Sequence, residues 1–219
     1  FAAKEPEQEV PVVSEVIDIN HTKEYEDLII HKVNEHTRAY IKIQDGCNQF
    51  CSYCIIPYTR GRIRSKNPEE VIEEVKNLAA QGYKEIVLTG IHLSSYGKDL
   101  GTVNLLDVIK RIQQIEDVER IRLGSLEPRI ITEEFVKELV KCDKVCPHFH
   151  LSLQSGCDET LKRMNRKYTT EEYEEALNIL RKYYEHPALT TDVIAGFVGE
   201  TEEEFEKTRA YLEKINLYE

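Results

Sequence analysis

The sequence predicts an α/β fold built on a parallel sheet, and three observations carry this prediction. Short β-rich runs alternate with longer helical stretches five times between residues 40 and 214. Helix-start signals, Asn or Thr followed by acidic residues, precede several of the helical stretches. With 219 residues, 41% of them hydrophobic, the chain can bury one sizeable core. Alternating strands and helices form right-handed βαβ units, whose sheet either closes toward a barrel or stays open and doubly wound.

The β-rich runs and the stretches between them give the predicted elements in order. The strands are expected at Tyr40–Gln44, Glu85–Thr89, Arg120–Gly124, Phe149–Leu153 and Thr191–Ala195. The helices are expected at Glu69–Gln81, Leu105–Ile115, Glu133–Lys141, Glu171–Tyr184 and Glu202–Lys214. Thr169 and Thr201 each begin a capping box, and Asn67 caps the first helix, which Gly82 ends.

The overall composition limits the classes of function. The formal net charge of −11 is unfavourable for a protein that binds long nucleic acid by itself. No apolar run approaches the roughly 20 residues of a membrane-spanning helix, and the N-terminus has no signal-peptide pattern. We therefore expect a cytoplasmic protein that does not enter a membrane. Residues 1–37, acidic and without periodicity, are expected to be a linker or the end of an upstream domain.

Three of the six cysteines lie together in the loop that follows the first predicted strand. Cys47, Cys51 and Cys54 form a C-x₃-C-x₂-C pattern. Thiolates are the usual ligands of iron–sulfur clusters, and three of them leave the fourth iron of a cubane open to another ligand. A structural zinc site is the alternative, although zinc normally takes four closed ligands, often in paired motifs. The pattern favours a [4Fe-4S] cluster.

The other strand ends add polar or small residues at the same edge of the sheet, where function gathers in parallel α/β folds. They are Thr89-Gly90, Ser125-Leu126-Glu127, Gln154-Ser155-Gly156 and Gly196. The sheet is thus expected to place these residues beside the cysteine loop.

The cysteine loop and its flanks resemble the radical S-adenosylmethionine (SAM) methylthiotransferases. The resemblance is carried by YIKIQDGCNQFCSYCIIPY, GYKEIVLTGIHLSSYG, HLSLQSGCDETLKRMNRKYT and DVIAGFVGETEEEF, and it runs from about Arg38 to the C-terminus. The TGIH form, residues 89–92, is most similar to the branch that modifies N6-threonylcarbamoyladenosine in tRNA. Val198 departs from the family pattern, which commonly has Pro there.

The resemblance implies an incomplete (βα)₆ barrel over residues 38–219, truncated near the sixth strand. It also implies a [4Fe-4S] cluster on the three cysteines, with SAM at the open iron. One-electron cleavage of SAM would then yield a radical that abstracts hydrogen from C2 of adenine, before sulfur insertion and methyl transfer. The electron would come from a donor such as flavodoxin or ferredoxin. An auxiliary [4Fe-4S] cluster is expected only in a domain missing from this chain.

The resemblance also implies which residues contact the cofactor. Tyr53 is expected near the SAM adenine, Thr89 and Gly90 at the methionine amine, and Ser125 and Glu127 at the ribose. Gln154 or Ser155 is expected to touch SAM or substrate, Arg166 the SAM carboxylate, and Ile194 and Gly196 the adenine. Simpler alternatives remain for several: Gly90 and Pro128 could merely turn the chain, and Arg166 could be a solvated helix-end cation.

A basic run follows directly on the cysteine loop. Arg60, Arg62, Arg64 and Lys66 are expected to contact phosphates of a tRNA anticodon stem-loop, or else to form an ordinary solvated charge run. The expected activity is methylthiolation of threonylcarbamoyladenosine next to the anticodon. The alternatives are isopentenyl-adenosine in tRNA, an aspartate of a ribosomal protein, or a zinc-stabilised binding module with no activity.

Overall fold

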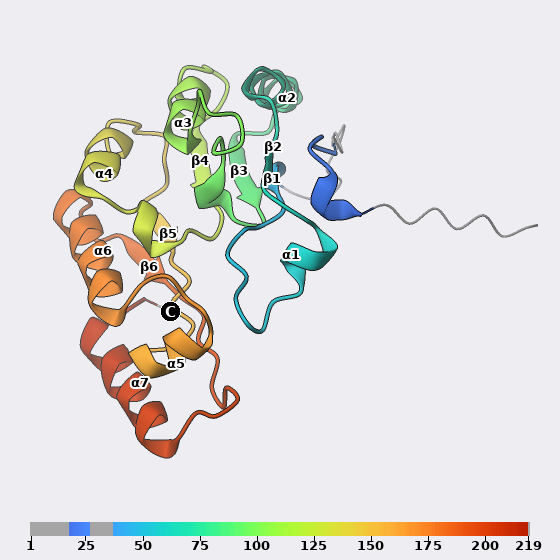
Figure 1. Cartoon of the computed structure of the whole chain (residues 1–219). Coiled ribbons are helices and arrows are strands. Elements are labelled where there is room, and N and C mark those ends of the chain that lie inside the picture. The colour runs from blue at the N-terminus through green and yellow to red at the C-terminus, as the bar shows by residue number, and fades with distance from the viewer. Residues whose placement is uncertain (1–17, 27–36, 219) are drawn as a thin grey trace, which may run out of the picture.

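The computed structural model describes residues 18–26 and 37–218, and its strands form one curved row (Figure 1). Two ladders make up this row. In the first, β1 (Arg38–Asp45), β3 (Glu85–Gly90) and β4 (Arg120–Leu123) are parallel, and the short β2 (Arg64–Ser65) pairs antiparallel with the end of β1. In the second, β5 (His148–His150) and β6 (Ala188–Thr190) are parallel. The predicted parallel sheet is confirmed.

Isolated bridges connect the two ladders into one surface. Ile121 pairs with Val145 and Leu126 with Leu151, both in parallel orientation. The long helices follow one another along the outer side of the row (Figure 1). They are α2 (Pro68–Ala80), α3 (Leu105–Gln113), α4 (Glu133–Leu139), α6 (Thr170–Tyr183) and α7 (Glu202–Ile215). A doubly wound sheet carries helices on both faces, so the curled, barrel-like alternative is the correct one.

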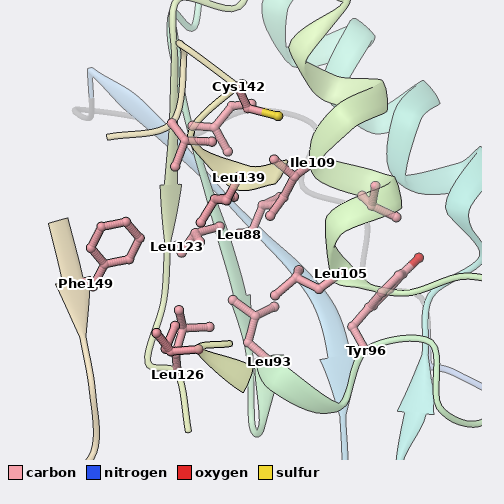
Figure 2. Close-up of a cluster of buried hydrophobic side chains, with 14 of the residues drawn as sticks. Leu88, Leu93, Tyr96, Leu105, Ile109, Leu123, Leu126, Leu139, Cys142 and Phe149 are labelled. Atoms are coloured by element: carbon pink, nitrogen blue, oxygen red, sulfur yellow. The ribbon is translucent and has the colours of Figure 1, made fainter. Parts of the chain in front are cut away.

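The core lies between the strands and these helices. Leu88 of β3 and Leu123 of β4 point toward Ile109 of α3 and Leu139 of α4 (Figure 2). All four side chains are buried, and each stabilises the fold by roughly 2 kcal/mol through its removal from water.

The helix boundaries confirm the predicted caps. Asn67 accepts a hydrogen bond from the Glu69 N–H, and Thr169 and Thr201 form complete capping boxes with the acids three residues on. Gly82 has φ +97° just beyond α2, a left-handed conformation that glycine adopts without steric cost. Among the described residues, two short α-helices were not predicted: α1 (Ile56–Thr59) and α5 (Asp158–Arg163).

The last strand lies earlier in the chain than the sequence predicts. We expected Thr191–Ala195, but β6 ends at Thr190, and beyond it Val193 forms only a single bridge with Gln154. The Thr191 hydroxyl explains the interruption, because it accepts from the Leu153 N–H (3.0 Å) and donates to the Leu151 carbonyl (2.6 Å). This side chain therefore replaces backbone partners that a regular ladder would supply.

Part of the expected N-terminal linker packs against the barrel. Residues 1–17 and 27–36 lie outside the described residues, but the Tyr25 hydroxyl donates to the Lys42 carbonyl of β1 at 2.6 Å. The Ile19 carbonyl approaches Gly61 so closely that a Cβ there would lie 2.4 Å from its oxygen. Across the described part of the chain, no helix is long and apolar enough to span a bilayer.

Candidate functional site

The cysteine loop leaves β1 through a tight turn at its C-terminal end. Gly46 has φ +68°, and a Cβ at this position would lie 1.8 Å from the Arg62 carbonyl oxygen, so only glycine fits. The next N–H, of Cys47, donates to the Gly61 carbonyl at 3.0 Å. The return of the chain through residues 61–65 thus holds the first cysteine against the strand end.

The middle of the loop is fixed by the turn after α5. The Ser52 N–H donates to the Met164 carbonyl (3.0 Å), and the Ser52 hydroxyl donates to the Arg163 carbonyl (2.9 Å). The Asn165 amide donates to the Phe50 carbonyl at 2.7 Å. These contacts join the cysteine loop to a segment more than a hundred residues away, and no local signal in the sequence predicts them.

The thiols differ in their surroundings. Cys47 is buried, whereas Cys51 and Cys54 are half-buried. Burial raises the pKa of the Cys47 thiol, and the hydrogen bond from the Gln49 N–H opposes that rise. Arg166 donates from Nη1 to the Cys51 Sγ at 3.2 Å, which places a positive charge where a thiolate would be stabilised.

The donor set fits an iron–sulfur cluster better than a single metal ion. Among the described residues, no three His, Cys, Asp or Glu side chains converge as the ligands of one ion would. A zinc site needs four ligands around one ion. In a cubane cluster each thiolate binds a different iron, so the three sulfurs need not meet at one point. Three thiols on one loop at the strand ends satisfy that requirement.

The end of β3 approaches the cysteine loop closely. A Cβ on Gly90 would lie 2.9 Å from the Gln44 side chain, which itself donates to the Asp45 (2.6 Å) and Gly46 (2.7 Å) carbonyls. Gln44 also accepts from the His92 N–H at 2.7 Å. The Thr89 hydroxyl donates to the Ile41 carbonyl, so it belongs to the β1–β3 pairing. Gly90 therefore does more than turn the chain: it makes room for Gln44.

A polar network connects the ends of β3 and β4. Glu127 is buried and lies 3.6 Å from His92 Nε2, and Gln49 Nε2 is 3.4 Å from both side chains. Burial raises the pKa of Glu127, but its contact with His92 and the charge of Arg129 outweigh burial and lower it. Ser125, at the same strand end, is exposed. The family resemblance assigned no cofactor contact to His92.

Ser155 does not face the barrel mouth as we expected. Its side chain is fully buried, and its hydroxyl lies 3.1 Å from the Thr208 hydroxyl of α7. A Cβ on Gly156 would lie 2.9 Å from Tyr211, also on α7. Ser155 and Gly156 therefore pack against helix α7. Gln154 is only partly buried and has φ +73°.

The loop after β6 lies near the cysteine loop. The ring of Tyr53, 41% exposed, meets that of Phe197 edge-on at 6.2 Å, and burial of its hydroxyl raises the pKa of Tyr53 to about 12. Glu200 accepts from the Gly196 (2.6 Å) and Phe197 (3.2 Å) N–H groups. It therefore shapes this turn, while Glu204 completes the Thr201 cap.

One carboxylate oxygen of Glu200 is buried without a hydrogen-bond partner. Such an oxygen marks a position where an incoming donor would be stabilised. Ile194 is partly buried beside this turn in the sequence, and Val198, at the position where Pro was expected, is 85% exposed.

Only half of the basic run faces solvent. Arg60 and Arg62 are exposed, and the Arg62 guanidinium lies 4.7 Å from the centre of the Phe50 ring. Arg64 and Lys66 are buried. Arg64 pairs with Asp45 at 3.8 Å and Lys66 with Glu74 at 2.7 Å. The expected phosphate contacts are therefore wrong for Arg64 and Lys66, because strand β2 and the residue that follows it direct these side chains into the fold.

The fold and the loop together define a class: a parallel half-barrel domain with a thiolate site at the C-terminal ends of its strands. A family model described as the radical SAM superfamily matches residues 41–212, and the chain belongs to that superfamily.

Named relatives support a closer resemblance. The chain is 45% identical over 203 residues to threonylcarbamoyladenosine tRNA methylthiotransferase MtaB of Bacillus subtilis (strain 168), covering 92% of this chain and 45% of the relative. It is 42% identical over 198 residues to a tRNA-2-methylthio-N(6)-dimethylallyladenosine synthase of Clostridium botulinum, covering 88% and 44%. The chain thus spans about half the length of the curated relatives it matches.

Solved structures agree on the fold. The radical SAM methyltransferase TsrM from Kitasatospora setae superposes with a TM-score of 0.67 at 20% identity, over 82% of this chain and 34% of that one. Coproporphyrinogen III oxidase (HemN) from Escherichia coli superposes with a TM-score of 0.57 at 15% identity, over 82% and 42%. The expected barrel is confirmed, and superfamily membership argues against the zinc-stabilised binding module.

Proposed function

We propose that this chain is the cluster- and SAM-binding core of an enzyme that methylthiolates an adenosine beside the tRNA anticodon. The observation that carries the proposal is the three-cysteine loop, held at the strand ends of a domain 45% identical to MtaB. The substrate proposed first is N6-threonylcarbamoyladenosine, which that relative's name contains. We place this activity in the cytoplasm, with a small redox protein such as flavodoxin or ferredoxin as electron donor.

In this proposal Cys47, Cys51 and Cys54 hold a [4Fe-4S] cluster, and SAM binds beside it. The cofactor supplies the one-electron chemistry that breaks a strong C–H bond, and the protein orients the reactants and excludes water. Ser125 is exposed just beyond the end of β4 and is the residue proposed to contact the SAM ribose, with the buried Glu127 held beside it by His92 and Gln49. The proposal also assigns contacts with SAM to Tyr53 of the cysteine loop and to Gln154, Ile194 and Gly196, which follow β5 and β6 in the chain.

The RNA would approach from the side of α1. Ile55 and Tyr58 are 65% and 62% exposed, close to the exposed cations Arg60 and Arg62. Unpaired RNA bases stack on aromatic rings and guanidinium planes, and phosphates pair with arginine. An anticodon loop is unpaired, so this patch suits it better than a duplex.

One experiment tests the cofactors. The protein is reconstituted anaerobically with iron and sulfide, and its iron, zinc and EPR spectrum are measured with and without SAM. We expect about four irons per chain and a reduced-cluster signal that SAM perturbs, both lost in Cys51→Ala. One zinc per chain, with no effect of SAM, would overturn the proposal.

A second experiment tests the substrate. Isopentenyl-type adenosine remains the alternative because the 42% identity to the dimethylallyladenosine synthase is nearly as high. The complete gene product is expressed in a bacterium lacking both tRNA methylthiotransferases, and its tRNA nucleosides are analysed by mass spectrometry. We expect the 2-methylthio form of threonylcarbamoyladenosine. Methylthiolation of the isopentenyl nucleoside alone would assign that nucleoside as the substrate instead, and the absence of both 2-methylthio nucleosides would overturn the proposal.

A further inference from the structure

The inner face of the half-barrel, which is the sheet face turned away from the helices, carries arginines. Leu123 of β4 points into the core beneath α3 and α4 (Figure 2), and Ile121 is buried in the same core. Side chains alternate between the two faces of a strand, so Arg120 and Arg122 lie on the opposite, inner face. Strand β4 therefore presents positive charge to the inside of the half-barrel.

One carboxylate on this face serves three arginines. Glu85 Oε2 accepts a hydrogen bond from Arg120 Nε at 2.8 Å, and its Oε1 accepts one from Arg122 Nε at 2.9 Å. The Nη1 of Arg38, at the start of β1, lies 3.6 Å from the same Oε1. A single negative charge is thus shared by three positive ones, and the remaining positive charge favours an additional anion.

The terminal nitrogens of the Arg122 guanidinium are available to a ligand. In the part of the chain that the structure describes, this side chain bonds to Glu85 through Nε alone, and neither Nη1 nor Nη2 has a hydrogen-bond partner. The Arg122 side chain is 27% exposed, so it is partly removed from water but still accessible. Two neighbouring nitrogens of an arginine match the two oxygens of a carboxylate. Arg122 can therefore bind a carboxylate without losing its bond to Glu85.

Two histidines of β5 lie on the same inner face. His148 and His150 flank Phe149, which is buried in the core. His150 Nε2 lies 3.4 Å from Asp192, whereas Nδ1 of His148 is buried without a hydrogen-bond partner. Burial and the nearby charges of Arg122 and His150 lower the pKa of His148. The His148 ring therefore stays neutral at pH 7, with a nitrogen that a polar group of a ligand would satisfy.

These side chains lie below the cysteine loop, along the direction of the strands. Arg122 is the register partner of Val87, and Gly90 ends β3 three residues further on. At about 3.3 Å per residue, Arg122 begins about 10 Å below the strand ends. The threonylcarbamoyl group extends from N6 of adenine and ends in a carboxylate. With the adenine held at the strand ends, this group and the long arginine side chain together can bridge that separation.

We propose that Arg122, with His148 beside it, binds the carboxylate of the threonylcarbamoyl group and selects this nucleoside over adenosines whose N6 substituent is uncharged. The inference rests on the proposed function, since it names the residues that choose the substrate of that same site. An isopentenyl group at this position would cover the guanidinium without pairing its charge, which is unfavourable. The discrimination comes from a buried charge that one substrate satisfies and the other does not.

The test uses the complete gene product, reconstituted with iron and sulfide, and three anticodon stem-loop RNAs. The RNAs carry threonylcarbamoyladenosine, its neutral methyl ester, or unmodified adenosine at the same position. Dissociation constants are measured anaerobically by fluorescence anisotropy, and formation of the 2-methylthio product is measured by mass spectrometry. Arg122→Gln removes the charge. Arg120→Gln is the matched control, because Arg120 also donates from Nε to Glu85 but lies further from the strand end.

For the wild-type protein we expect the acid to bind about tenfold more tightly than its methyl ester. Arg122→Gln should bind both equally, and its affinity for the unmodified RNA should stay within about twofold of wild type. Arg120→Gln should keep the wild-type preference. No preference in the wild-type protein, or a preference that survives in Arg122→Gln, would overturn the inference. Equal weakening of all three RNAs would also overturn it, because it would assign Arg122 to a backbone phosphate.

If Arg122→Gln fails to fold or to load the cluster, Arg122→Lys decides. Lysine keeps the charge but lacks the planar fork. A reduced preference for the acid, with unchanged binding of the unmodified RNA, supports the inference, and an unchanged preference contradicts it. A wild-type protein that forms no 2-methylthio product from the threonylcarbamoyl RNA counts against the proposed function instead.

Discussion

The Asn165 amide donates to the Phe50 carbonyl at 2.7 Å, and both residues have left-handed backbones, with φ of +58° and +52°. Such conformations are unfavourable for side chains other than glycine, and asparagine tolerates them best. One hydrogen bond therefore stabilises two strained positions at once, one in the cysteine loop and one in the turn after α5.

Replacing Asn165 tests this bond. Asn165→Ala removes the donor and places a less tolerant residue at φ +58°, so we expect the free energy of unfolding to fall by about 2 kcal/mol. Asn165→Gly removes the donor but relieves the backbone, and it should cost roughly half as much. Urea denaturation of the metal-free proteins measures both. Equal losses would show that the backbone conformation contributes nothing.

Ser155 and Ser125 should respond in opposite ways. Ser155→Ala loses the buried contact with Thr208 and should reduce the free energy of unfolding by about 1 kcal/mol, with SAM affinity unchanged. Ser125→Ala, at an exposed strand end, should leave stability unchanged and weaken SAM binding. Denaturation and SAM titration of the reconstituted proteins separate the two effects. Weaker SAM binding in Ser155→Ala would instead support the prediction from sequence that Ser155 contacts SAM.

Replacing buried and exposed cations of the basic run should affect different properties of the protein. Lys66→Met leaves the buried Glu74 carboxylate unpaired and should lower the free energy of unfolding by about 3 kcal/mol. Arg62→Ala, on the surface, should leave stability unchanged, weaken binding of an anticodon stem-loop RNA, and reduce the slope of log affinity against log salt by about 0.7. An unaltered salt dependence in Arg62→Ala would remove this residue from the RNA surface.

The Glu85 carboxylate should make the free energy of unfolding fall more steeply as the pH decreases. Burial raises its pKa, but hydrogen bonds from Arg122 and Arg120 outweigh burial, so the folded-state pKa is lowered. The stabilisation is therefore complete above the unfolded value of about 4.3, and it is lost as the pH falls through the lower folded value. Urea denaturation of Glu85→Gln between pH 6 and 3 should show a flatter dependence than wild type. Glu119→Gln, with an exposed side chain, should behave as wild type.

Much of the fold was predictable because its signals are local. The alternation of strands and helices and the caps at Asn67, Thr169 and Thr201 depend on neighbouring residues, and the structure confirms them. The position of β6 was not predictable, because the Thr191 hydroxyl replaces backbone partners only after the strands are assembled.

The site was less predictable where it depends on contacts distant in sequence. The cysteine spacing identifies the loop, but nothing local shows that Asn165 and Arg166 reach it across more than a hundred residues. Burial of Arg64 and Lys66 likewise depends on the pairing of β2 with β1, since a two-residue strand has almost no sequence signal. The left-handed backbone of Phe50 is a local structural feature that accompanies its contact with Asn165.

The junction between β4 and β5 has a mechanical consequence. In the described part of the barrel, single bridges connect the two ladders there. The cysteine loop follows β1 of the first ladder, and hydrogen bonds at Ser52 and Phe50 join it to the turn after α5, a helix that lies between β5 and β6 in the chain. The loop therefore connects the two sides of this junction. A change in the curvature of the half-barrel at this line would therefore be transmitted through Ser52 and Phe50 to the loop that carries the three thiols.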